Sequence, residues 1–114
     1  MIDYTIIVPV YCNEHSLKFL FEKINNEVIE KNKNLKGQIV FCDDGSTDKS
    51  YEILVDLNKN HSNVKVIKLS RNFGQASGIY AGLSNMDSKS YIIMSADLQD
   101  PVELINQFLD VYFD

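Results

Sequence analysis

The chain has 114 residues, a formal net charge of −5 and an apolar content of 45%, which together predict one folded globular domain and leave no room for a second. Its lysines and arginines form no cluster. We therefore expect no nucleic-acid partner, because phosphate backbones are bound by clustered basic residues. An acidic protein still binds an anionic ligand where a cation or backbone N–H groups screen the charge.

Cys12 and Cys42 lie far apart in the sequence and form no CxxC pair. So few ligands argue against zinc, and we expect two buried free thiols in a reducing compartment. The start, MIDYTIIVPV, lacks the basic segment of a secretory signal. No apolar run approaches the roughly 20 residues that span a membrane. The sequence therefore predicts a cytoplasmic protein.

Four runs of apolar and β-branched residues predict β-strands at residues 4–10, 38–42, 64–69 and 91–95. Helical periodicity predicts four helices, at residues 15 to about 33, 51 to about 58, 76 to about 85, and 101 to the last residue. Ser46 or Thr47 is the expected N-cap of the second helix. Asp100 is the expected N-cap of the fourth, because Pro101 follows it.

Strands that alternate with helices along the chain predict a parallel sheet covered by helices on both faces. Right-handed connections then give a Rossmann-like α/β fold. Gly78 and Gly82 inside the third predicted helix either weaken that prediction or mark close packing. With Gly74 they have a spacing of four and four, which is no GxGxxG fingerprint and argues against NAD-dependent enzymes.

Mostly polar residues follow each of the four predicted strands, at the edge where parallel sheets bind ligands. In chain order they are Pro9, Tyr11, Asn13 and Glu14, then Asp43 and Asp44, then Arg71, Asn72 and Gly74, and finally Ser95, Asp97, Gln99 and Asp100. Any one group has an ordinary explanation as a turn or a helix cap. Four groups at one edge of a sheet predict a ligand site.

The side chains after the first three strands are suited to a nucleotide. Tyr11 offers a flat ring on which a base stacks, although a tyrosine at a strand end is more often a core residue. Asp43 or Asp44 can accept hydrogen bonds from a base or a ribose hydroxyl. Arg71 is either a surface charge or a group that meets a phosphate or the edge of a base.

The carboxylate and amide oxygens after the fourth strand are suited to a divalent cation. Asp97 and Gln99 supply the oxygen ligands that Mg2+ and Mn2+ prefer. Such a cation would bridge the diphosphate of a nucleotide sugar and stabilise its departure as a Lewis acid. Asp100 is better explained as the helix cap.

Four stretches, in this order and spacing, resemble the inverting family 2 glycosyltransferases of the GT-A fold. The likeness is greatest to the branch that transfers a sugar to a polyprenyl phosphate, such as dolichyl-phosphate mannose synthases and bactoprenol glucosyltransferases. The stretches are IIVPVYCNE, VFCDDGSTDKS, LSRNFGQASGIYAG and IIMSADLQDPVELI. From the first to the last they span nearly the whole chain, and they are specific only as a set.

The resemblance implies a site made of residues from all four stretches. Pro9, Tyr11 and Glu14 would line the nucleoside pocket. Asp43 or Asp44 would bind the base or the ribose, and Arg71 would help to hold the nucleotide. Asp97 would also contact the nucleotide and, with Gln99, would ligate Mg2+ or Mn2+. Two positions depart from the family pattern: Ser95 stands where DADLQ has its first acid, and Cys12 is an extra residue in VPVYNE.

For the protein as a whole, the resemblance implies a single displacement with inversion at the anomeric carbon of a UDP- or GDP-sugar. The acceptor would be a polyprenyl phosphate or a glycan, and the parent protein would lie at the cytoplasmic face of a membrane. The catalytic domains of this family are expected to be about twice as long as this chain, which is within the usual range of domain sizes. We therefore expect the general base to lie beyond Asp114 and the isolated fragment to be inactive. An exposed sheet edge would also allow two copies to associate as a homo-oligomer.

Three other functions compete with this one. A sugar nucleotidyltransferase needs a glycine-rich loop after the first strand, and VYCNEHS has no glycine. A receiver-type signalling domain needs an acid at the end of the third strand, where Leu69 is followed by Ser70 and Arg71. A module that binds a nucleotide without catalysis is compatible with these residues.

Overall fold

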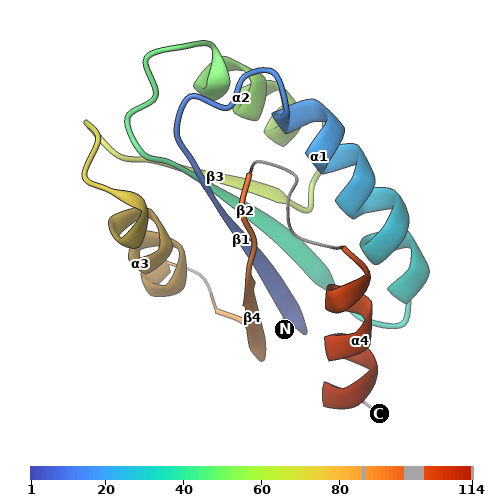
Figure 1. The fold of residues 1–114 in the computed structure, drawn as a ribbon. Helices are drawn as coiled ribbons and strands as arrows, with labels where there is room; N and C mark the ends of the chain where they lie inside the picture. The colour runs from blue at the N-terminus through green and yellow to red at the C-terminus, as the bar shows by residue number, and fades with distance from the viewer. Residues whose placement is uncertain (86, 97–101, 114) are drawn as a thin grey trace.

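The computed structural model describes residues 1–85, 87–96 and 102–113. Its elements, shown in Figure 1, are β1 (Tyr4–Val10), α1 (Leu17–Ile24), the π-helix η1 (Asn25–Ile29), the 3-10 helix η2 (Glu30–Asn32), β2 (Gly37–Asp43), α2 (Ser50–Asn60), β3 (Val64–Lys68), α3 (Gln75–Asn85), β4 (Ser90–Ile93) and α4 (Glu103–Tyr112). The predicted alternation of strands and helices is confirmed. The fourth strand begins and ends earlier than residues 91–95.

The four strands form one parallel sheet in the order β3-β2-β1-β4. Ile6 in the central strand β1 lies opposite Ile39 on one side and Ile92 on the other. This is the strand order of a Rossmann-like half, so the predicted fold is confirmed. Because all strands are parallel, their carboxyl ends and the loops that follow them meet at one edge of the sheet.

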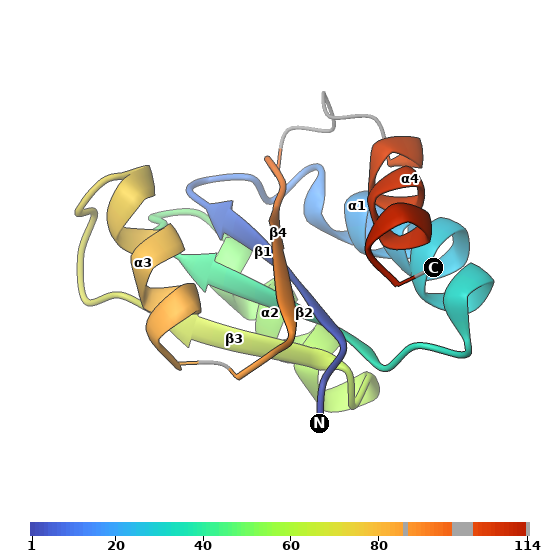
Figure 2. The same ribbon diagram turned by 90° about the horizontal axis from the view of Figure 1, so that it is seen from below.

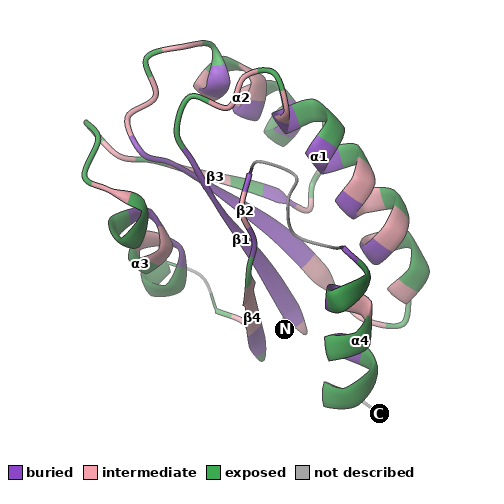
Figure 3. Cartoon of the chain, in the orientation of Figure 1, coloured by how far each residue is buried: buried purple, intermediate pink, exposed green. Residues whose placement is uncertain are grey.

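Helices cover both faces of the sheet (Figures 2 and 3). The alternation of side chains along β1 explains how both faces are packed. Tyr4, Ile6 and Val8 point to one face, where they share a buried core with α1, α2 and α4. Ile7 points to the other face, where it packs with Val40 and Cys42 under α3. A strand buried on both sides reads as a continuous apolar run, which is why the prediction of β1 was right.

Close packing explains the two glycines of α3. A Cβ atom on Gly82 would lie 3.0 Å from Ile7 Cγ2 and 3.1 Å from Cys42 Sγ, and one on Gly78 would lie 3.6 Å from Cys42 Cβ. The helix backbone therefore rests on β1 and β2, and a Cβ atom at Gly82 would be in tight contact with side chains of both strands. Of the two explanations offered by the sequence, close packing is correct.

Two helix predictions need correction. The first helix is not one regular helix, because a π-turn interrupts it and leaves the carbonyls of Glu27 and Val28 to accept amide hydrogens from Asn106 and Asn32, both at 2.8 Å. The second helix begins at Ser50 with Lys49 as N-cap, so the expected caps Ser46 and Thr47 are wrong.

Two further observations complete the fold. No helix among the described residues is long and apolar enough to cross a membrane. The predicted cap Asp100 and its neighbour Pro101 lie outside the described residues.

Candidate functional site

A polar cleft of about 300 Å3 opens at the carboxyl ends of the strands. It is lined by residues at or just after the carboxyl ends of all four strands: Pro9, Val10, Tyr11, Asn13, Asp44, Asn72, Gly74, Gln75, Ser95 and Ala96. The prediction that polar groups from four strand ends meet at one edge is thus confirmed. Of the site residues that the sequence predicts, Pro9, Tyr11 and Asp44 line this cleft. Gln75 lies within the stretch LSRNFGQASGIYAG, but the sequence does not single it out as a site residue, since its place in the cleft depends on where α3 begins.

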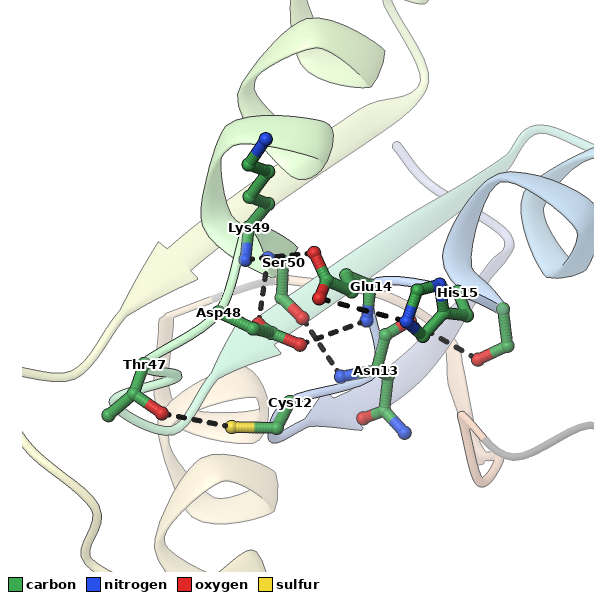
Figure 4. A network of polar contacts seen from close by, with 9 residues as sticks. Cys12, Asn13, Glu14, His15, Thr47, Asp48, Lys49 and Ser50 are labelled. Carbon is green, nitrogen blue, oxygen red and sulfur yellow. Dashed lines mark hydrogen bonds and ion pairs between the residues drawn. The ribbon is translucent and has the colours of Figure 1, made fainter.

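The loop after β1 is paired with the segment that leads into α2 (Figure 4). Successive backbone N–H groups of residues 12–14 donate to side chains of residues 46–50. Cys12 N–H donates to Ser46 Oγ at 2.9 Å, and Asn13 N–H donates to Ser50 Oγ at 2.9 Å. Glu14 N–H donates to Asp48 Oδ2 at 3.2 Å. Ser46, one of the two residues expected to cap α2, instead accepts a hydrogen bond from the backbone of the neighbouring loop.

Glu14 faces the start of α2. Its Oε2 accepts a hydrogen bond from Lys49 N–H at 3.3 Å, and its Oε1 lies 3.8 Å from His15 Nε2. Together with the bond from Glu14 N–H to Asp48, this makes a reciprocal clamp between two loops. The carboxylate is not among the groups that line the cleft, so its predicted place in the nucleoside pocket has no support from the cleft geometry.

Cys12 adopts a left-handed backbone conformation, with φ of 53°. The backbone kinks there, and Ser46 Oγ accepts the Cys12 N–H. Cys12 Sγ lies 3.5 Å from Thr47 Oγ1, and the hydrogen bonds from Thr47 lower the pKa of the exposed thiol. The expectation of two buried thiols is wrong for Cys12. It is correct for Cys42, whose pKa burial raises to about 11.

Tyr11 stands beside this kink with 48% of its surface exposed, so it is not a core residue. Its backbone N–H donates to Asn13 Oδ1 at 2.9 Å. The charge of Cys12, followed by desolvation, raises the pKa of its phenol, which therefore stays neutral at physiological pH. The cleft thus has an uncharged aromatic ring at its rim, as a base-stacking site requires.

Asp44 is buried and holds the loop after β3. Its Oδ1 accepts from Phe73 N–H at 2.7 Å, and its Oδ2 accepts from Gly74 N–H at 2.8 Å and from Asn72 Nδ2 at 3.3 Å. One carboxylate therefore fixes one wall of the cleft. The remaining acceptor capacity of these oxygens is what a ligand can use.

Asp43 lies beneath the cleft rather than in its wall. Its side chain is fully buried, and its Oδ1 accepts from Ser46 N–H at 3.3 Å. Its Oδ2 has no hydrogen-bond partner within the described part of the chain. Of the two acids that the sequence left open for the base or ribose, only Asp44 lines the cleft.

Arg71 is exposed and stacks on a neighbour rather than lining the cleft. Its guanidinium carbon lies 4.7 Å from the centre of the Phe73 ring. The predicted metal ligands Asp97 and Gln99 lie outside the described residues. Within those that are described, no three His, Cys, Asp or Glu side chains gather to hold a metal.

The stretch that leads to Asp97 is held at its described end. Ser95 and Ala96 line the cleft, and Ser16 Oγ donates to the carbonyl of Ala96 at 2.9 Å. The loop after β1 therefore contacts the chain directly before the expected metal ligands.

A second groove of about 370 Å3 lies between β4 and α4. It is lined by Tyr91, Ile92, Ile93, Met94, Leu104, Ile105 and Phe108. This lining contains no charged side chain and no amide. Such a surface cannot compensate the charge of a diphosphate, so the polar cleft is the better candidate for a nucleotide.

Comparison with known proteins identifies relatives over almost the whole chain. Residues 5–114 match the family described as Glycosyl transferase family 2. An uncharacterized glycosyltransferase of Synechocystis sp. is 36% identical over 109 residues, covering 96% of this chain and 34% of the relative. An undecaprenyl-phosphate 4-deoxy-4-formamido-L-arabinose transferase of Photorhabdus laumondii is 36% identical over 102 residues, covering 89% and 31%.

The fold is shared with TarS of S. aureus, solved as residues 1–349 in complex with UDP-GlcNAc. The TM-score is 0.75 at 21% identity, covering 98% of this chain and 32% of TarS. The chain spans about a third of the length of the curated relatives it matches. The family match over residues 5–114 nevertheless decides its classification. The chain belongs to the family 2 glycosyl transferases.

Proposed function

We propose that this chain is the nucleotide-binding part of an enzyme that transfers a sugar, with inversion, from a UDP- or GDP-sugar to a polyprenyl phosphate or a similar acceptor. The observation that carries the proposal is the polar cleft, which gathers groups from four strand ends beside the exposed ring of Tyr11. The name of the Photorhabdus relative supports the acceptor class. A polyprenyl acceptor would place the whole protein at the cytoplasmic face of a membrane.

In this proposal the described residues bind and orient the nucleoside. Tyr11 stacks on the base, and the amides of Asn13, Asn72 and Gln75 offer donors and acceptors to its edge. Asp44 accepts a hydrogen bond from the base or ribose, using the acceptor positions of its carboxylate that the donors of the loop after β3 do not occupy. The cleft volume of about 300 Å3 is at the lower end for small-molecule sites, which suits a nucleoside better than a complete nucleotide sugar.

Asp97 and Gln99 would hold Mg2+ or Mn2+ beside the cleft. When bound, the cation would neutralise the diphosphate as it leaves. Ser95 supplies a neutral hydroxyl where the family pattern has an acid, so most of the metal affinity would come from Asp97.

Titration calorimetry with UDP, GDP and their sugars in the presence of Mn2+ tests this proposal. We expect one base to be preferred, and Asp97→Ala to remove the effect of Mn2+ on affinity. Tyr11→Ala should weaken binding about tenfold, since a base stacked on an aromatic ring contributes about 1–3 kcal/mol. Tyr80→Ala is the matched control, because Tyr80 is 72% exposed on α3 and does not line the cleft. No binding of any nucleoside diphosphate would refute the proposal.

A further inference from the structure

We propose that Ser46 is a positioning residue that holds the ring of Tyr11 in place and thereby sets the affinity for the base. The inference rests on the proposed function and deepens it. Ser46 does not line the cleft and reaches the ligand only through the backbone of the neighbouring loop. Its effect on binding must therefore pass through a residue that the loop carries into the cleft. Tyr11 and Asn13 are the two such residues, and Ser46 holds the peptide next to Tyr11, whereas Ser50 holds that of Asn13.

The geometry gives Ser46 control of the kink at Cys12. Its Oγ accepts the Cys12 N–H at 2.9 Å, and its own N–H donates to the buried Asp43 at 3.3 Å. The hydroxyl is thus held in place from the core of the sheet. Cys12 has a left-handed φ of 53°, a conformation that residues with a Cβ avoid unless the surroundings impose it.

The position of Tyr11 depends on that kink. The peptide N–H that Ser46 accepts joins Tyr11 to Cys12, so its orientation fixes the plane of the bond that follows Tyr11. Tyr11 makes one further backbone contact in this loop, from its N–H to Asn13 Oδ1. Without the serine hydroxyl, Cys12 can relax to an ordinary φ, and the ring would sample orientations in which it does not cover the base.

Other bonds keep the loop folded when this one is lost. Asn13 N–H still donates to Ser50 Oγ, and Glu14 N–H still donates to Asp48. Removing Ser46 Oγ should therefore loosen the end of the loop nearest Tyr11 without unfolding the protein. This separates a positioning effect on Tyr11 from a general loss of structure.

A double-mutant cycle tests the inference, with UDP and GDP in the presence of Mn2+ as ligands. We expect Ser46→Ala to weaken binding three- to tenfold and Ser46→Thr, which keeps the hydroxyl, to restore most of the affinity. In the Tyr11→Ala background, Ser46→Ala should have no further effect, because the group it positions is already gone. Ser62→Ala is the matched control, since Ser62 is exposed before β3 at the opposite edge of the sheet.

Hydrogen exchange of the ligand-free chain provides a second readout. The Cys12 amide should exchange faster in Ser46→Ala than in the unaltered chain, and the Ser50-bound Asn13 amide should change less. Additive losses in the cycle, or an unchanged Cys12 exchange rate, would overturn the positioning role. Failure of the unaltered chain to bind UDP or GDP would instead refute the proposed function, which the exchange measurement does not depend on.

Discussion

The two walls of the cleft are built in different ways. On one side lie the paired loops, defined as residues 11–14 and 46–50, in which several side chains each hold one N–H group of the partner. On the other side lies the β3 loop, residues 71–74, in which the single carboxylate of Asp44 takes three donors. Substituting one side chain in the paired loops should therefore cost only part of their stability. The β3 loop, in contrast, depends on Asp44 and its neighbour in the sequence.

That neighbour is Gly45, which directly precedes residues 46–50 in the sequence and packs against the backbone of Arg71 and Asn72. It has a φ of 71°, and a Cβ atom there would overlap the backbone of Arg71 and Asn72. Gly74 also has a positive φ, of 103°, but nothing lies within 4 Å of the place of its Cβ. The two glycines thus share a backbone requirement and differ in the space around them.

The largest effect is expected from Gly45→Ala. The substitution adds a left-handed alanine and a backbone clash, so it should destabilise the protein by about 3–5 kcal/mol. Gly74→Ala meets the backbone requirement alone and should cost about 1–2 kcal/mol. Urea denaturation of both variants measures the difference. Equal costs would show that the β3 loop is not packed against Gly45.

A smaller effect is expected from Asp44→Ala. It leaves the amides of Phe73 and Gly74 without their acceptor, which should cost about 2–3 kcal/mol in the free energy of unfolding. Asp48→Ala, in the paired loops, should cost about 1 kcal/mol, because the neighbouring serine bonds remain. The denaturation midpoints of the two variants measure these costs. The hydrogen-exchange rates of the amides of residues 73 and 74 show whether the β3 loop is loosened. A larger loss from Asp48→Ala would contradict the contrast between the walls.

The smallest effect is expected from Cys12→Gly, and it has the opposite sign. Glycine adopts a φ of 53° without strain, so the substitution should stabilise the protein by about 0.5–1 kcal/mol after the entropy of the unfolded glycine is subtracted. Cys12→Ala keeps the Cβ and should leave stability nearly unchanged. Thermal unfolding of both variants checks the sign, and a lower melting temperature for Cys12→Gly than for Cys12→Ala would sink the argument.

Most of the fold could be predicted because strands buried on both faces, such as β1, appear as continuous apolar runs. The bounds of the helices were less predictable. At the π-turn in the first helix, two backbone carbonyls accept hydrogen bonds from the amides of Asn32 and Asn106, and Asn106 belongs to α4, which is distant in the sequence. The caps expected at Ser46 and Thr47 failed for a similar reason, since Ser46 accepts an N–H group from another loop.

The sequence by itself determined the family, the parallel sheet and the edge at which polar groups gather, because each follows from local pattern and chain order. The tertiary structure alone decided which of those groups line the cleft. Glu14 and Asp44 are both acids at strand ends, yet one clamps the start of α2 and the other holds the β3 loop at the cleft. A carboxylate bonds to whichever donors lie nearest, and that depends on how distant segments pack together.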